Sequence, residues 1–174
     1  MKYYTGVGDK GKTSIAGKRV RKDSNIINAI GDVDEVNASL GHAYSFINDE
    51  EVKGILKDLE RCLYVVGSEL SGYIRVVKSK VKPIDGEDLS RLEQTIESIS
   101  KRIEPMQKFI YPNGSAGATA INVSRAMARR AERSIIKANV KDEPLLRYMN
   151  RLSSLLFVLV RYVNKLEKTE EEYF

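Results

Sequence analysis

The 174-residue sequence predicts an all-α protein, a five-helix antiparallel bundle with a glycine-rich loop at its N-terminus. Five segments carry apolar residues at a period near 3.6, which is the period of a helix. Prolines and glycines stand in the connections, for example Pro83, Gly86 and Pro105. We expect a single domain over residues 1–174, with the loop at 1–24, the helical bundle at 25–166 and an acidic tail at 167–174.

The first helix is expected to begin after Asp23 or Ser24, either of which can cap it. The second helix covers about residues 49–73, a basic connection follows at 74–87, and the third helix covers about residues 87–103. Ser115 is a candidate cap for the fourth helix, which has no glycine or proline from residue 118 to residue 140. The fifth helix, about residues 145–166, is the most apolar and is expected at the centre of the bundle. The tail after it is expected to be frayed.

Composition limits the classes of function. A net charge of +5 fits either nucleic acid or a small polyanion, but the basic residues cluster at 10–22 and 125–133, which favours a small anionic ligand. One cysteine, Cys62, and one histidine, His42, cannot form a disulfide or a zinc site. No apolar run predicts a membrane span and the first residues do not resemble a signal peptide. We therefore expect a cytoplasmic protein without a nucleic-acid or membrane partner.

A stripe of arginines follows one face of the fourth predicted helix. Arg125, Arg129, Glu132 and Arg133 stand at i, i+4, i+7 and i+8, so they share that face, while Arg130 lies off it. Guanidinium groups repeated on one face suit an oxyanion ligand such as a phosphate chain, which they bind at two points. The stripe therefore predicts an anion-binding surface, and an ordinary solvated helix face is the alternative.

Residues 5–24 combine four glycines with many hydroxyl and lysine side chains. They match G-x-G-x-x-G and G-x-x-x-x-G-K-[ST] literally, at Gly6, Gly8, Gly11, Lys12 and Thr13. Both motifs need a buried strand before them and a helix directly after them, and neither is predicted here, so a Rossmann fold and a P-loop fold are rejected. Backbone N–H groups at glycines, with lysine, threonine and serine donors, still suit a phosphate-binding loop. A disordered basic tail is the alternative.

Three acidic residues lie early in the first predicted helix, directly after Gly31: Asp32, Asp34 and Glu35. Acidic side chains near a helix N-terminus can simply complement the helix dipole. That explanation covers Asp32 better than Asp34, which lies farther along the helix. We therefore expect Asp34 to pair with an arginine.

Five blocks of sequence follow one another across nearly the whole chain. They are Tyr4-Thr5-Gly6-x-Gly8-Asp9-x-Gly11-x-Thr13-Ser14, Gly31-Asp32-Val33-Asp34-Glu35-Val36-Asn37, Phe109-Ile110-x-Pro112-x-Gly114, Arg125-x-x-x-Arg129-Arg130-Ala131-Glu132-Arg133 and Asn150-Arg151-Leu152-Ser153. In order and spacing, these blocks resemble the PduO-type ATP:cob(I)alamin adenosyltransferases. The chain departs from the family pattern at Asn113, where glycine is common, and at Asn122, where histidine is common.

The resemblance implies a homotrimer with active sites between subunits. It implies transfer of the 5′-deoxyadenosyl group of ATP to Co(I) of a corrinoid such as cobalamin, which gives adenosylcobalamin and triphosphate. Mg²⁺ would come bound to ATP, and no side chain is assigned to it as a ligand. A corrinoid reductase and an adenosylcobalamin-dependent enzyme would be partners.

The same resemblance assigns the site residues. Asp34, Arg125, Arg129 and Phe109 would be catalytic, with Asp34 pairing with Arg125 across the subunit interface. Phe109 and Phe157 would line the corrinoid pocket, where Phe109 would exclude the axial base of the corrinoid. The ATP site would comprise Thr5, Gly6, Val7, Gly8, Thr13, Ser14, Lys22, Arg129, Arg130, Glu132, Arg133 and Asn150.

The residues fit this chemistry. Because Co(I) is itself the nucleophile, the protein has to supply positioning and charge for the departing triphosphate, and arginine, lysine and backbone N–H groups supply both. Two alternatives stay open: a nucleotide-binding sensor on the same bundle that does not turn over, and a basic helical nucleic-acid binder. Phe109 favours the enzyme, since ATP binding alone does not need it.

Overall fold

The computed structural model describes residues 3–76 and 81–174, so part of the basic connection predicted at 74–87 lies outside the described residues. Within these ranges the chain forms five long helices, one four-residue helix and one two-stranded hairpin. The predicted mostly helical class is therefore confirmed. The elements are β1 (Lys12–Ile15), β2 (Lys18–Arg21), α1 (Asn25–Tyr44), α2 (Glu50–Leu70), α3 (Tyr73–Val76), α4 (Gly86–Ser100), α5 (Ala116–Lys137) and α6 (Glu143–Leu166).

Polar caps set where the helices begin. The side chains of Asp49, Asp85, Ser115 and Asp142 each accept a hydrogen bond from a backbone N–H in the first turn of α2, α4, α5 and α6. Ser24 is the N-cap residue of α1, but its buried hydroxyl has no hydrogen-bond partner in the described part of the chain. All five starts lie within about two residues of their predicted positions, as capping signals allow.

Helix α6 is the centre of the hydrophobic core, as its apolar sequence predicts. It packs against α5, α4 and α2, and its buried residues occupy most of its circumference. Leu152, Leu156 and Leu159 are fully buried. Burying a large aliphatic side chain of this kind contributes roughly 1.5–3 kcal/mol. The core that forms around α6 therefore holds the other helices in register.

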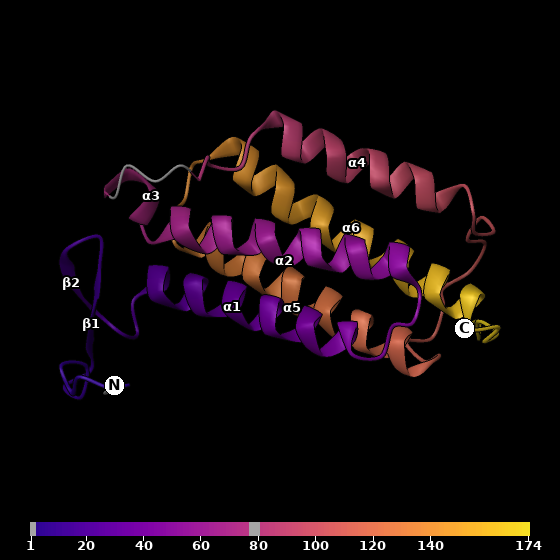
Figure 1. Cartoon of the computed structure of the whole chain (residues 1–174), viewed down its shortest axis with the longest axis horizontal. Coiled ribbons are helices and arrows are strands. Elements are labelled where there is room, and N and C mark those ends of the chain that lie inside the picture. The colour runs from indigo at the N-terminus through magenta and orange to yellow at the C-terminus, as the bar shows by residue number, and fades with distance from the viewer. Residues whose placement is uncertain (1–2, 77–80) are drawn as a thin grey trace.

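The helices lie side by side, with the hairpin at one end of the bundle and the C-terminus at the other (Figure 1). Helix α1 packs antiparallel to α2 and to α5, and α5 packs antiparallel to α6. Helices α4 and α6 are also in contact but run in the same direction, because residues 101–115 lead from the end of α4 into α5 at the same end of the bundle. The antiparallel prediction is therefore wrong for the α4–α6 pair.

The N-terminal segment contains a hairpin that was expected to be loop. Strands β1 and β2 pair antiparallel, with Thr13 opposite Val20. Ala16 and Gly17 connect the two strands and have positive φ values of 45° and 76°, as in the two-residue turns that are typical of β-hairpins. Such turns usually contain Asn-Gly or Asp-Gly, and an alanine with positive φ gives no such signal in the sequence.

Two predicted helix ends are too late. Helix α2 ends at Leu70 because Gly72 reverses the chain with a φ of 70°, and a single helical turn, α3, follows. Helix α4 ends at Ser100. In the described ranges, no helix is long and apolar enough to cross a membrane.

The expectation of a frayed tail is also wrong. After α6 the chain turns at Lys168, which has a φ of 53°, and Glu171 then pairs with the buried Arg161 of α6. Backbone hydrogen bonds join residues 172–174 to residues 109–111. Acidic composition could not indicate this arrangement, because both partners of the tail are remote in sequence.

Leu156→Ala should lower the free energy of unfolding by about 2–5 kcal/mol, because its loss leaves a cavity in the core around α6. The measurement is urea-induced unfolding followed by circular dichroism at a fixed protein concentration. Leu166→Ala is the matched control on the same helix, where the side chain is 40% exposed, and it should cost much less. Equal losses for the two variants would contradict the central position of α6.

Candidate active site

The glycine-rich segment before β1 forms a series of tight turns. The carbonyl oxygen of Gly6 accepts a hydrogen bond from Asp9 N at 3.2 Å, and that of Gly8 accepts one from Gly11 N at 3.2 Å. Gly6 and Gly11 have φ values of 69° and 72°, a region that glycine adopts without strain. Thr5 Oγ1 accepts a bond from Val7 N at 3.4 Å. Four predicted phosphate-binding residues, Thr5, Gly6, Val7 and Gly8, thus lie on one segment before the hairpin, whereas Thr13 and Ser14 lie in β1 and Lys22 directly follows β2.

Two basic side chains hold this segment against the hairpin. Arg19 donates to Val7 O at 3.0 Å and to Ser14 Oγ at 3.3 Å. Lys22 Nζ comes so close to Gly8 that a Cβ atom there would lie 3.2 Å from it. Lys22 was predicted as a site residue and Arg19 was not. Arg19 reaches Ser14 only because the two residues are opposite each other in the hairpin.

A groove of about 500 Å³ lies between the hairpin, α1 and α2. It brings together two predicted site residues from separate segments, Thr13 and Asp34. Asn37 also lines the groove, and its buried Oδ1 has no hydrogen-bond partner in the described part of the chain. A buried oxygen without a donor costs free energy. The groove therefore presents an acceptor that a ligand or a neighbouring chain could satisfy.

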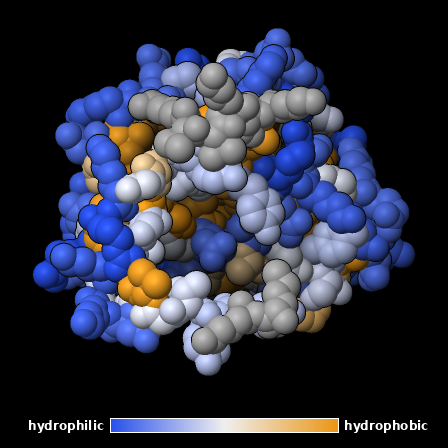
Figure 2. Space-filling view, turned by 60° about the vertical axis from the view of Figure 1, so that its left-hand side comes forward, coloured by the Kyte–Doolittle hydropathy of each residue, from blue (hydrophilic) through white to orange (hydrophobic). Residues whose placement is uncertain are grey.

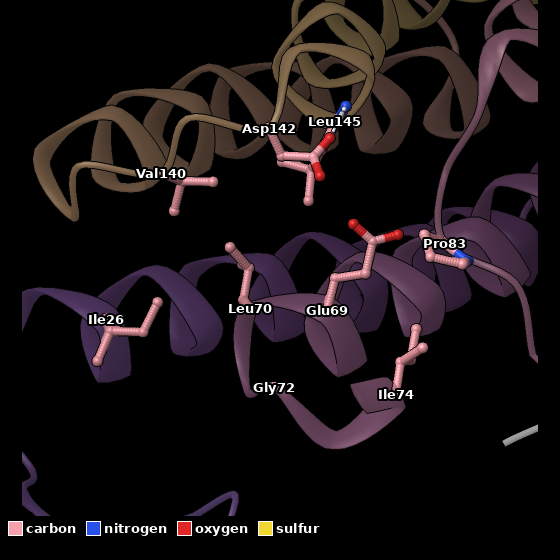
Figure 3. A pocket seen from close by; sticks show the side chains of 9 residues that line it. All are labelled: Ile26, Glu69, Leu70, Gly72, Ile74, Pro83, Val140, Asp142 and Leu145. Atoms are coloured by element: carbon pink, nitrogen blue, oxygen red, sulfur yellow. Dashed lines mark hydrogen bonds between the residues drawn. The ribbon is translucent and has the colours of Figure 1, made fainter. Parts of the chain in front are cut away.

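A smaller cavity of about 250 Å³ lies at the same end of the bundle (Figure 3). Figure 2, which brings this end forward, shows hydrophobic residues at the base of a hollow. Two carboxylates on its walls, Glu69 and Asp142, accept backbone hydrogen bonds from Ile84 and Leu145. No predicted site residue lines this cavity, whereas Thr13 and Asp34 line the groove, so the groove is the better candidate. The lining residues are Ile26, Glu69, Leu70, Gly72, Ile74, Pro83, Val140, Asp142 and Leu145.

The arginine stripe lies on the outer face of α5. Arg129 and Arg133 are exposed and have no hydrogen-bond or ion-pair partner within residues 3–76 and 81–174. Arg125 is half-buried, and its Nε donates to Asn122 Oδ1 at 2.7 Å. Burial lowers the pKa of Arg125, and the nearby charge of Arg129 lowers it further. Within the described ranges, no carboxylate pairs with Arg129 or Arg133, so their positive charge is available to an anionic ligand.

Arg130 points in a different direction from the stripe. Its guanidinium pairs with Asp32, Nε to Oδ1 at 3.3 Å, and with Glu35. Ser134 also donates to Asp32, so these contacts join α5 to α1. The helical spacing predicted that Arg130 lies off the stripe, and this is confirmed. Its place in the ATP site stays a prediction from the family resemblance.

Glu132 and Asn150, both predicted for the ATP site, lie together. Asn150 Nδ2 donates to Glu132 Oε1 at 2.9 Å, and Arg151 donates to Asn150 Oδ1 at 2.9 Å. Arg151 in turn donates to Glu93 Oε1 at 3.0 Å, which extends the network from α5 through α6 to α4. No sequence pattern pointed to Glu93, because α4 carries none of the family blocks.

Asp34 and Arg125 do not pair within one chain. Asp34 is exposed on α1 and has no hydrogen-bond or ion-pair partner among the described residues. Arg125 is on α5, where Asn122 is its hydrogen-bond partner. Asn122 also approaches the carbonyl oxygen of Pro112, with Nδ2 at 3.5 Å. The pairing of Asp34 with Arg125 between subunits stays a prediction.

The predicted corrinoid residues lie apart from the glycine-rich segment. Phe109 belongs to the connection between α4 and α5, at the opposite end of the bundle from the hairpin (Figure 1). Its ring is 80% exposed, and Phe157 on α6 is half-buried. One chain therefore does not gather the glycine-rich segment and Phe109 into a single pocket.

The chemistry of the arrangement is binding and charge stabilisation. The hairpin end contributes hydroxyl and ammonium groups, and α5 contributes guanidinium groups without neutralising partners. Within the described ranges, no three histidine, cysteine, aspartate or glutamate residues gather as a metal-binding group. Such an arrangement suits a phosphorylated ligand.

Known proteins match this chain along most of its length. The family model described as cobalamin adenosyltransferase matches residues 3–163. A corrinoid adenosyltransferase of Bacillus subtilis is 34% identical over 171 residues, which cover 94% of this chain and 87% of that protein. The corrinoid adenosyltransferase PduO of Salmonella typhimurium is 35% identical over 166 residues, which cover 92% of this chain but 49% of that protein. The chain thus spans about half the length of the Salmonella relative and most of the Bacillus one.

Solved structures share the fold. A variant of a PduO-type ATP:corrinoid adenosyltransferase from Lactobacillus reuteri, with a phenylalanine replaced by histidine, is complexed with cobalamin and ATP; its TM-score is 0.91 at 30% identity over 99% of this chain and 96% of that chain. An arginine-to-lysine variant complexed with ATP has a TM-score of 0.88 at 30% identity, over 98% of this chain and 99% of that chain. The family model matches residues 3–163, and the first of these solved structures covers 99% of the chain. This chain therefore belongs to the cobalamin adenosyltransferase family.

Proposed function

We propose that this protein is a corrinoid adenosyltransferase, which transfers the 5′-deoxyadenosyl group of ATP to Co(I) of a corrinoid such as cobalamin. The observation that carries the proposal is similarity over almost the whole chain to enzymes of that name, one of which has been solved with cobalamin and ATP bound. In the reaction a bond forms between cobalt and C5′. The bond between C5′ and oxygen breaks, and its electron pair leaves on triphosphate.

The glycine-rich segment would bind the phosphate chain of ATP, and the arginine stripe would stabilise the departing triphosphate. Backbone N–H groups of the segment, with the side chains of Thr13, Ser14 and Lys22, would hold the phosphate chain. Arg129 and Arg133 would stabilise the negative charge that grows on triphosphate as it departs. The lack of an ion-pair partner for either arginine among the described residues supports this role, since a ligand then meets no competing carboxylate.

Phe109 would act on the corrinoid. A phenyl ring has no lone pair, so it can take the place of the axial nitrogen base without ligating cobalt. Removing an axial donor lowers the energy of the cobalt orbital that accepts an electron, and axial ligation is a known lever on metal potentials. The 80% exposure of the ring supports the role, because the ring is open to a ligand.

We further propose a homotrimer with active sites between subunits. Two features of the single chain support it. Asp34 lacks a partner in the described residues, and Phe109 lies far along the bundle from the hairpin. Contacts between unlike surfaces of identical chains close into a ring, and such contacts bring different parts of neighbouring chains together.

Mg²⁺ would enter with ATP. The oxygen donors in the groove fit this mode of binding, because Mg²⁺ in nucleotide sites is usually held by phosphate oxygens and few protein ligands. Thr13 lines that groove, and its hydroxyl is a donor of the right kind. The ion would offset phosphate charge. A corrinoid reductase and an adenosylcobalamin-dependent enzyme would be partners, and a single cysteine fits the reducing cytoplasm.

The direct test is anaerobic mixing of the protein with ATP, Mg²⁺ and chemically reduced cobalamin. The absorption spectrum of the Co–C product should appear, and triphosphate should be released in equal amount. ATP binding without this product would point to the nucleotide-binding sensor. Weak ATP binding, together with nucleic-acid binding that depends steeply on salt, would point to the basic helical nucleic-acid binder.

Arg129→Ala should raise the KM for ATP and lower kcat, because a charge-assisted hydrogen bond to the departing triphosphate is worth about 1.5–3 kcal/mol. Arg130→Ala should change kcat/KM less but lower the melting temperature, because it removes the ion pairs of Arg130 with Asp32 and Glu35. Steady-state kinetics and thermal unfolding of the two variants measure these effects on kcat/KM and on the melting temperature. A reversed kinetic ranking would place Arg130 in the ATP site.

Asp34→Asn and Arg125→Ala should have strongly non-additive effects on kcat/KM. If the two side chains pair in a buried interface, losing one partner strands the other, which can cost about 3–5 kcal/mol. Analytical ultracentrifugation of each variant reports whether the trimer persists. If the double variant shows the simple product of the two single effects, the pairing is refuted.

Phe109→Ala should impair adenosylation of cobalamin from the Co(II) state far more than that of cobinamide, which lacks the lower base. The loss should shrink when Co(I) is supplied preformed, because Co(I) holds no strong axial ligand. The readout is the ratio of kcat/KM for the two corrinoids. The melting temperature should hardly change, since the ring is 80% exposed. An unchanged ratio would exclude the axial role.

A further inference from the structure

The C-terminal tail, residues 167–174, forms backbone contacts with the connection that carries Phe109. Phe174 N donates to Phe109 O at 2.9 Å, and Tyr111 N donates to Glu172 O at 2.9 Å. Between these two bonds, Ile110 pairs with Tyr173 in an antiparallel bridge. The rings of Tyr111 and Phe174 also meet edge to face, with centroids 5.9 Å apart. The last residues of the chain thus act as a short strand beside residues 109–111.

One ion pair holds the tail in this position. Arg161 of α6 donates to Glu171 through two bonds, Nε to Oε1 at 2.7 Å and Nη2 to Oε2 at 2.9 Å. Both side chains are well buried, at 6% and 15% exposure. The hydrogen bonds that Arg161 donates to Glu171 raise the pKa of Arg161, while burial lowers it. A buried guanidinium needs a partner, so the tail and α6 depend on each other.

Helix α6 also fixes the other end of the same connection. Asn164 Oδ1 accepts a hydrogen bond from Ser115 N at 3.0 Å. Gly114 has a φ of 146°, and a Cβ there would lie 2.3 Å from Asn164 Oδ1. Residues 109–115 are therefore held by Asn164 at one end and by the tail at the other. Both attachments depend on α6, because Asn164 bonds to Ser115 directly and Arg161 binds Glu171 of the tail.

The Phe109 ring itself contributes almost nothing to its own placement. At 80% exposure it has little packing with the protein, and its residue is joined to the tail through its carbonyl oxygen. A side chain in this setting is only as well placed as its backbone. The entropy of an unrestrained loop would otherwise have to be lost when the ligand binds.

We propose that the tail is a strap that positions Phe109 for the corrinoid, with Arg161 and Glu171 as positioning residues that fasten it. The proposal rests on the corrinoid role of Phe109 proposed above. Opening the ion pair should release residues 170–174, loosen residues 109–111 and let the axial base compete with the phenyl ring. The predicted residues of the ATP site lie outside the tail and outside residues 109–111, so they should be unaffected.

Glu171→Gln is the test variant, since it keeps the size of the side chain and removes its charge. Glu51→Gln is the control, because Glu51 also forms a two-point pair with an arginine, Arg102, at 2.6 and 2.9 Å. This pair is more exposed than that of Arg161 and Glu171, and within the described ranges Glu51 has no hydrogen bond to the tail or to residues 109–111. Hydrogen exchange read by mass spectrometry should show faster exchange in residues 109–111 and 170–174, by about tenfold, only in Glu171→Gln. This readout does not depend on activity.

The kinetic readout separates positioning from general damage. Glu171→Gln should lower kcat/KM for Co(II) cobalamin by about tenfold and change the value for cobinamide much less. The KM for ATP and the rate with preformed Co(I) should stay near those of the wild type. Arg161→Lys, which keeps the charge but forms no two-point pair, should give the same selective loss if Glu171→Gln fails to fold.

The outcomes distinguish the strap from the proposed function. If the tail exchanges faster while residues 109–111 stay protected, or if the ratio of the two corrinoids is that of the wild type, the strap is refuted although the enzyme stands. Equal loss of protection and activity in Glu51→Gln would also refute it, as a general stability effect. A wild-type protein with no activity on any corrinoid would refute the proposed function, whereas the exchange result would still stand on its own.

Discussion

The close packing of α5 between α1 and α6 is the constraint on which the rest of the structure depends. The packed face of α5 is made largely of small residues, among them Ser124, Ala128 and Ala131, all fully buried. Small side chains let helix axes approach closely, so the orientation of α5 about its own axis is fixed tightly. Because helix geometry ties the two faces together, burial of one face fixes where the arginines on the other face project.

That orientation separates two neighbouring arginines by function. Arg130 turns toward α1, where Asp32 and Glu35 neutralise it, and it therefore contributes to the fold. Arg129, one residue earlier, turns outward and finds no carboxylate within the described residues. A helix advances its side chains by roughly 100° per residue, so adjacent residues can serve the core contact and the ligand surface separately. The charge of the site is thus a consequence of how the core packs.

The two ends of the bundle carry different chemistry. The hairpin end offers glycine turns, hydroxyl groups and lysine, and the other end offers an exposed phenylalanine held by a returning tail. Helices α4 and α6 run in the same direction, so α4 ends at the end of the bundle opposite the hairpin. Residues 101–115, which carry Phe109, therefore cross that end before α5 begins. The glycine-rich segment and Phe109 therefore lie at opposite ends of one chain.

Much of the fold was determined by the sequence alone. The helical period, the cap at Ser115 and the apolar length of α6 are local signals, and local signals act through hydrogen bonds and burial within one element. The spacing of the arginines likewise placed the stripe on one face. Tertiary structure alone decided the hairpin, the contact of Arg19 with Ser14, and the folded tail with its Arg161–Glu171 pair. These depend on partners remote in sequence, or on an alanine with positive φ, so no local pattern encodes them.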